Sequence, residues 1–161
     1  MAKTAAAAKS ANTELKMTDY LFYYMWHVVT ESQRKIEEAM RPYGVKSPAW
    51  RVIMILREKK RLTISEIATE VLLENSRLSR IAKSLEEAGI VQRAKCDMDQ
   101  RYTQIELTDK GNQLYKELIP IVERQLESTL AGLSAQDRKK LDQMMRAMKD
   151  NTYRPAFANL G

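Results

Sequence analysis

The segment from residue 75 to residue 88 combines an apolar stripe with a face of hydrogen-bond donors. At helical spacing, Leu78, Ile81 and Leu85 fall on one side. The opposite side has no acid before Glu86 and carries Ser76, Arg77, Ser79, Arg80 and Lys83. Guanidinium groups bond bidentately to guanine, whereas hydroxyl and ammonium groups bond to phosphate oxygens. The segment therefore predicts a nucleic-acid-reading helix, in which Arg77 and Arg80 contact guanines and the other three make backbone or mixed contacts.

A second, shorter helix must position this one. Thr63 followed by Glu66 has the spacing of a capping box, so a helix is expected from Thr63 to about residue 71. The reading helix then begins near Asn75, and Gly89 follows as a residue that tolerates a left-handed turn. Thr63 and Ser65 are candidate phosphate contacts, and Asn75 is a further candidate DNA contact.

After Gly89 the hydrophobic period changes from helical to alternating. Beyond a polar turn, Thr103, Ile105 and Leu107 point one way while Gln104 and Glu106 point the other. This pattern predicts two antiparallel strands joined by a hairpin.

The hairpin is polar and basic, and its candidate DNA contacts are Lys95, Asp99, Gln100 and Arg101. Arg101 is the candidate for insertion into the minor groove. Asp99 either orients this arginine or forms a purely structural pair with it, and both roles can coexist.

The order helix, helix, strand, hairpin, strand is a winged helix-turn-helix, and the strand residues resemble a known family. Asp99-Gln100-Arg101 followed by Ile105, Leu107-Thr108 and Gly111 resembles the wing signature of the MarR family of bacterial transcriptional regulators. The resemblance extends from about Thr18 to Asp150. It implies a homodimeric, ligand-responsive regulator, most often a repressor, that binds a pseudo-palindromic operator.

Length and composition fit one domain. The chain has 161 residues, of which 44% are hydrophobic, and we expect a disordered tail over 1–16 and a single domain over 17–161. The winged lobe is expected at about 47–111. The single Cys and the absence of a long apolar run favour a cytoplasmic protein that does not enter a membrane.

Positive charge is concentrated beside the predicted reading element. The net charge is +6, and residues 41–61 alone contain seven basic side chains against Glu58. This distribution favours binding to an acidic polymer. For any one of these cations, solvation of a helix end is an equally good explanation.

The two ends of the chain predict long amphipathic helices, at about 18–40 and 108–150. Thr18 is expected to cap the first, and Ser47 followed by Pro48 to open the next helix. Thr108 and Ser134 are expected to cap the helices after the wing. A winged lobe alone cannot cover these apolar stripes, so the first and last helices are expected to interlock between two copies as a homodimer.

Aromatic and basic residues on the first two helices suggest an effector site at the junction of the lobes. The candidates are Tyr23, Trp26, His27, Trp50, Arg51 and Met54. The family resemblance implies phenolic or aromatic carboxylate ligands there, or their CoA thioesters. The alternative is ordinary core packing, with His27 hydrogen-bonded and Arg51 reaching solvent.

Other classes of function have weaker support. One His and one Cys do not supply the usual zinc ligand sets, and no phosphate loop or nucleophile motif occurs, so we expect neither an enzyme nor a metal site nor a cofactor. Two alternatives are a winged-helix module that binds an acidic protein and a redox-sensing regulator that acts through Cys96. Asp97 opposes thiolate formation at Cys96, which favours an incidental thiol.

Overall fold

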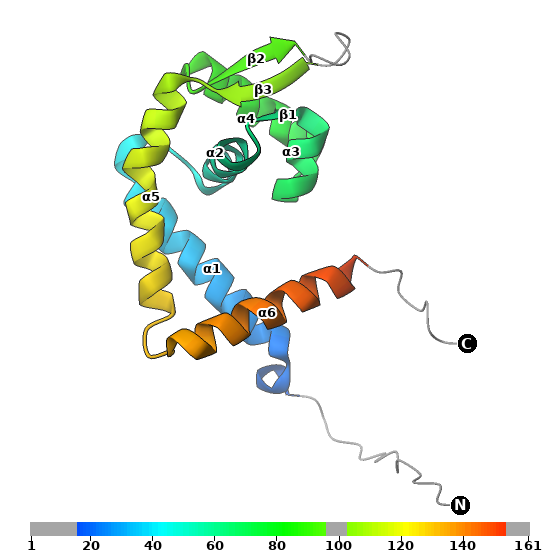
Figure 1. Cartoon of the computed structure of the whole chain (residues 1–161), viewed down its shortest axis with the longest axis vertical. Helices are drawn as coiled ribbons and strands as arrows, with labels where there is room; N and C mark the ends of the chain where they lie inside the picture. Colours follow the sequence, from blue (N-terminus) through cyan, green and yellow to red (C-terminus); the bar gives the residue numbers. More distant parts are fainter. Residues whose placement is uncertain (1–15, 96–102, 154–161) are drawn as a thin grey trace, which may run out of the picture.

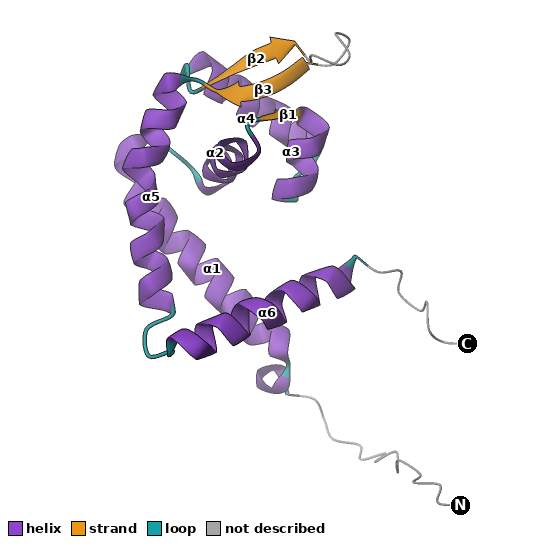
Figure 2. Ribbon diagram, viewed as in Figure 1, coloured by secondary structure: helices purple, strands orange, loops and turns teal. Residues whose placement is uncertain are grey.

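The computed structural model describes residues 16–95 and 103–153 (Figure 1). The wing tip, which includes Cys96, Asp99, Gln100 and Arg101, lies outside the described residues, as do residues 1–15 of the tail predicted over 1–16. The elements in the described part are α1 (Leu21–Met40), α2 (Ser47–Lys59), β1 (Arg61–Thr63), α3 (Ile64–Val71), α4 (Asn75–Glu87), β2 (Val91–Lys95), β3 (Thr103–Leu107), α5 (Asp109–Thr129) and α6 (Ala135–Thr152). The fold is mainly helical with a small sheet, as the sequence predicts (Figure 2).

The sheet has three strands where the sequence predicts two. β3 lies in the centre of the order β1-β3-β2 and pairs antiparallel with both neighbours. Ile105 of β3 lies opposite Leu62 of β1 on one side and Arg93 of β2 on the other. A strand of three residues is too short to show an alternating pattern in the sequence. β1 is recognised only by its backbone pairing with the distant strand β3.

The hydrophobic core lies in the winged lobe, where α2 packs against α3, α4, α5 and the sheet. Ile53 and Leu56 of α2, Ile67 of α3 and Leu78 of α4 are fully enclosed. Leu118 extends this core into α5 and is also fully buried. The recognition segment is therefore held by a packed scaffold.

Helices α1, α5 and α6 form the other half of the molecule. α5 leaves the winged lobe and runs along α1, and Ser32 lies 3.2 Å from Thr129 between their hydroxyl oxygens. α6 follows a turn after α5, and it overlaps α1 in the view of Figure 1. None of its residues is buried, in contrast to the other five helices. This half leaves a large apolar surface open within one chain.

Of the four helix caps predicted at Thr18, Ser47, Thr108 and Ser134, the last two are confirmed, whereas Thr18 and Ser47 do not cap their helices. Thr108 accepts from the Gly111 N–H at 3.0 Å, and Ser134 accepts from the Asp137 N–H at 3.2 Å. Thr18 lies inside a short 3-10 turn, so α1 begins only at Leu21.

The start of α2 is capped from outside its own sequence. Ser47 is the first residue of the helix, and the preceding Lys46 makes no side-chain cap bond. The carboxylate of Glu37, on α1, accepts from the Ser47 N–H at 3.3 Å. A partner ten residues away therefore takes the role that local spacing assigned to Ser47.

Candidate nucleic-acid interface

The predicted capping box at the start of α3 is confirmed. The Glu66 carboxylate accepts from the Thr63 N–H at 2.7 Å and from its hydroxyl at 2.8 Å, while the Thr63 hydroxyl accepts from the Glu66 N–H at 3.3 Å. The backbone N–H of Thr63, and then its hydroxyl, lower the pKa of Glu66 below the ordinary value of 4.5. The Thr63 side chain is thus already engaged in structure, whereas Ser65, in the first turn of α3, is exposed.

Helix α4 separates its apolar and polar faces as the sequence predicts. Leu78, Ala82 and Leu85 are buried. The predicted nucleic-acid contacts on this helix are all exposed: Asn75, Ser76, Arg77, Ser79, Arg80 and Lys83. Among the described residues, only Lys83 of this set has an ion-pair partner, Glu87, with 3.9 Å between the charged atoms. The surface therefore presents two unpaired guanidinium groups and two free hydroxyls to an incoming ligand.

The end of α4 is fixed to the sheet and to α5. Arg93 of β2 donates from Nε to Glu86 of α4 at 3.0 Å. From the start of α5, the Thr108 hydroxyl donates to the Gly89 carbonyl at 2.7 Å, and Lys110 donates to the Ala88 carbonyl at 2.7 Å. The orientation of α4 is thereby tied to α5.

A carboxylate on the central strand joins all three strands of the wing. Glu106 accepts from Gln92 of β2 at 2.8 Å and pairs with Arg61 of β1. These two partners, Gln92 first, lower the pKa of Glu106. Strand alternation identifies Glu106 as outward-facing, but nothing in the sequence indicates its partners. The side chain of Lys95 at the end of β2 lies outside the described residues, as does the wing tip.

The six candidate effector residues do not form one site within a single chain. On α1, Tyr23 lies 4.4 Å from His27 between ring centroids, while Trp26 is 68% exposed. On α2, Trp50 is buried, and its ring stacks on Tyr115 of α5. In Figure 1 the first half of α1 lies apart from α2. The remaining two candidates also belong to α2: Arg51, whose guanidinium bonds to the Val71 carbonyl, and Met54, which is exposed.

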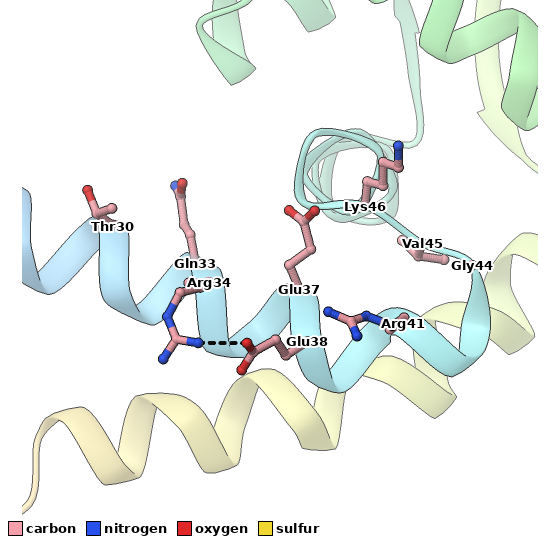
Figure 3. A pocket seen from close by; sticks show the side chains of 9 residues that line it. All are labelled: Thr30, Gln33, Arg34, Glu37, Glu38, Arg41, Gly44, Val45 and Lys46. Atoms are coloured by element: carbon pink, nitrogen blue, oxygen red, sulfur yellow. Dashed lines mark hydrogen bonds and ion pairs between the residues drawn. The ribbon is translucent and has the colours of Figure 1, made fainter.

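Two cavities meet at the connection between α1 and α2. One, of about 550 Å³, is a polar groove that includes Glu37, Arg41 and Lys46 (Figure 3). Figure 3 also shows an ion pair between Arg34 and Glu38, which line the same groove, with 2.6 Å between their charged atoms.

The second cavity, of about 440 Å³, lies between this connection and α4. Its lining is largely apolar and includes Val45, Ile81 and Leu85, together with the cations Lys46 and Arg77. The two walls of this cavity come from segments about 35 residues apart in the sequence. Helical periodicity relates only residues within one helix, so it does not indicate this cavity.

Two further findings concern the part of the chain that the structure describes. No group of three or more metal-ligating side chains is placed to hold a metal ion. No helix there is both long and apolar enough to cross a bilayer.

The MarR family model matches residues 45–103, which span α2 to the first residue of β3. The HTH-type transcriptional repressor IacR of Pseudomonas putida is 26% identical over 141 residues, covering 88% of this chain and 84% of that protein. Similarity to curated proteins therefore extends well beyond the winged lobe.

Solved structures share the fold across both halves. A MarR family regulator from Silicibacter pomeroyi superposes with a TM-score of 0.79 at 25% identity, covering 89% of this chain and 99% of that one. A mutant MarR from Escherichia coli complexed with operator DNA gives 0.70 at 19% identity, covering 80% and 92%. BpsR of Bordetella bronchiseptica, whose DNA binding is regulated by 6-hydroxynicotinic acid, gives 0.71 at 16% identity, covering 80% and 98%. The family model, the curated relative and the solved structures therefore agree that this chain is similar to MarR family regulators, over the winged lobe and over the flanking helices.

Proposed function

We propose that this protein is a sequence-specific DNA-binding transcriptional repressor that binds a pseudo-palindromic operator as a homodimer. The observation that carries the proposal is the face of α4, where Arg77 and Arg80 are exposed and unpaired among the described residues. A helix of this kind fits the major groove, where arginine reads guanine. In this proposal Arg101 at the wing tip enters the adjacent minor groove, and Asp99, Gln100 and Lys95 support it.

The test is a gel-shift assay with DNA fragments from around the protein's own gene. We expect one or a few fragments to shift at concentrations that leave random DNA of equal length free. The variant with Arg77→Ala and Arg80→Ala should lose this preference, while Lys139→Ala, an exposed cation on α6, should keep it. Binding of all fragments with equal affinity would favour the alternative, in which the basic face binds an acidic protein.

The homodimer is supported by apolar side chains that one chain leaves exposed. Val28 on α1 is 51% exposed and Met144 on α6 is 57% exposed. A monomer rarely exposes apolar patches of this extent, and a two-fold axis would let the same patch cover itself. Two copies would then place their α4 helices about 34 Å apart, one turn of DNA.

The proposed effector is an aromatic carboxylate, and its best-supported place is the second cavity beside α4. The apolar walls suit an aromatic ring, and Lys46 and Arg77 suit a carboxylate. Because Arg77 also faces the DNA side, an acid bound to it would compete with operator contact. Differential binding of this kind commonly changes affinity by roughly 5- to 150-fold.

The alternative effector site is the exposed part of the original candidates, Tyr23, Trp26 and His27 on α1. Hydroxylated aromatic acids, starting with 6-hydroxynicotinic acid, should be titrated against the protein–operator complex. If the second cavity binds them, Lys46→Gln raises the half-maximal concentration while Lys139→Gln does not. If Trp26→Phe and His27→Ala raise it instead, the site is on α1. CoA thioesters of these acids should be titrated in the same way. Their phosphates would require cations in addition to Lys46.

A further inference from the structure

Arg51 on α2 extends to the end of α3, the helix that precedes the reading helix. Its Nη1 donates to the carbonyl oxygen of Val71, the last residue of α3, at 2.9 Å. Its Nε is enclosed and has no hydrogen-bond partner in the part of the chain that the structure describes. No carboxylate pairs with this guanidinium among the described residues. A cation placed at a helix C-terminus instead interacts with the unpaired carbonyls and the negative end of the helix dipole.

The turn that Arg51 holds is short and contains an unfavourable backbone conformation. Leu72 follows Val71 with φ 54° and ψ 52°, the left-handed region that a leucine rarely adopts. The Leu73 N–H bonds back to the Ala68 carbonyl at 3.0 Å, which closes the end of α3. Leu72 itself is 72% exposed, so its own side chain contributes little packing to hold this conformation.

The reading helix starts immediately after this turn. Glu74 is the N-cap of α4 without a side-chain cap bond, and its carbonyl accepts from the Leu78 N–H at 2.9 Å. Only residues 72–74 separate the two helices, so any rotation of the turn re-aims Arg77 and Arg80. The contact between Arg51 and Val71 therefore lies where it controls the direction of α4.

We propose that Arg51 is a positioning residue for DNA discrimination, which acts through the Val71 carbonyl and the turn at Leu72 without touching DNA. The inference rests on the proposed function of α4. Without Arg51, the turn samples more orientations, and the orientation that fits the operator is populated less. Contacts with phosphates tolerate such freedom better than bidentate contacts with bases, so specific binding should lose more than non-specific binding.

The experiment compares Arg51→Met with Lys59→Met. Lys59 also lies on α2 and pairs with Glu70 in the last turn of α3, but through an exposed side-chain carboxylate and not through the carbonyl of Val71. Both variants lose one positive charge, so non-specific attraction to DNA falls equally. We expect Arg51→Met to reduce the ratio of operator to random-DNA affinity about tenfold, the order of one hydrogen bond from a charged group. Lys59→Met should leave this ratio unchanged.

A second measurement follows the turn itself in the free protein. Amide hydrogen exchange at Leu73 and Leu78 should accelerate in Arg51→Met and stay at the wild-type rate in Lys59→Met. Arg51→Lys keeps the positive charge and a hydrogen-bond donor, and it replaces Arg51→Met if that variant does not fold. Its affinity ratio and its exchange rates should lie between those of Arg51→Met and those of Lys59→Met. An unchanged affinity ratio together with unchanged exchange would overturn the proposal. Failure of the unaltered protein to discriminate DNA would instead overturn the proposed function, and the exchange data would still decide the role of Arg51.

Discussion

Gly111 in the first turn of α5 lies directly against the carbonyl of Ile90 at the start of the wing. A Cβ built on Gly111 would be 2.1 Å from the Ile90 oxygen, far inside any real contact, and the obstacle is backbone that cannot swing away. Thr108 bonds to the same carbonyl through its backbone N–H at 3.1 Å. Absence of a side chain at position 111 therefore lets α5 sit against the α4–β2 turn.

Gly111→Ala should destabilise the fold by about 1 to 3 kcal/mol, because α5 or the turn must move to admit the methyl group. Urea unfolding at a fixed protein concentration measures the change, since dimer stability depends on concentration. Ser128→Ala, on an exposed position of the same helix, should stay within about 0.5 kcal/mol. Equal stability of the two variants would show that the contact with Ile90 is easily relaxed.

The capping box at the start of α3 should make stability pH-dependent. The pKa of Glu66 is lowered in the folded state, so the folded protein binds fewer protons at this site than the unfolded chain. The resulting stabilisation is present above the ordinary value of 4.5 and disappears as the pH falls through the lower folded value.

Glu66→Gln should therefore lose less stability than the wild type on acidification from pH 6 to pH 3. Glu58→Gln, on an exposed carboxylate that is not part of the capping box, is the matched control and should follow the wild-type curve. Thr63→Ala, which removes the reciprocal bond, should cost about 1 kcal/mol at neutral pH. Parallel acid curves for Glu66→Gln and the wild type would rule out the assigned role of this carboxylate.

Local spacing identified the parts of the fold whose partners are close in sequence. Thr63 with Glu66, Thr108 with Gly111 and Ser134 with Asp137 are three residues apart, so side-chain chemistry and helical geometry predict each cap. The buried stripe of α4 is predictable for the same reason, because helical periodicity alone defines it.

Features that depend on distant segments were not predictable. Strand β1 pairs with residues more than forty positions later, and Glu37 caps α2 from another helix. Trp50 of α2 is buried against Tyr115 of α5, a contact between distant segments that the sequence does not indicate, while the effector role of the candidates on α1 and α2 stays a prediction. The wing-tip contacts at Asp99, Gln100 and Arg101 stay predictions, because they lie outside the described residues.

DNA affinity should fall steeply with salt. Each phosphate contacted by a cation releases condensed counterions, which corresponds to roughly 0.9 log units of affinity per tenfold change in salt. Titrations of operator and random DNA at several salt concentrations give the slope for each. Affinity independent of salt would be incompatible with the proposed basic interface, whatever its specificity.

Assembly should depend on the exposed apolar side chains of α6. Met144→Glu places a charge in the proposed interface and should shift the protein toward monomer in sedimentation experiments at micromolar concentration. Operator affinity should fall in parallel, because a monomer reaches only one half-site. Gln136→Glu, at the polar start of the same helix, should keep both properties. A Met144→Glu dimer with wild-type affinity would place the interface elsewhere.

Arg80→Ala tests base reading most directly. Arg80 is exposed on α4 and has no partner among the described residues, so its removal leaves the fold intact and deletes only an external contact. If it reads guanine, operator affinity should drop by about 1 to 3 kcal/mol, and one base position per half-site should lose its discrimination in a panel of single-base operator variants. Lys83→Ala is the matched comparison, because a phosphate contact should weaken operator and random DNA by the same factor and reduce the salt slope. If Arg80→Ala behaves like Lys83→Ala, Arg80 contacts phosphate, and base recognition then depends on Arg77.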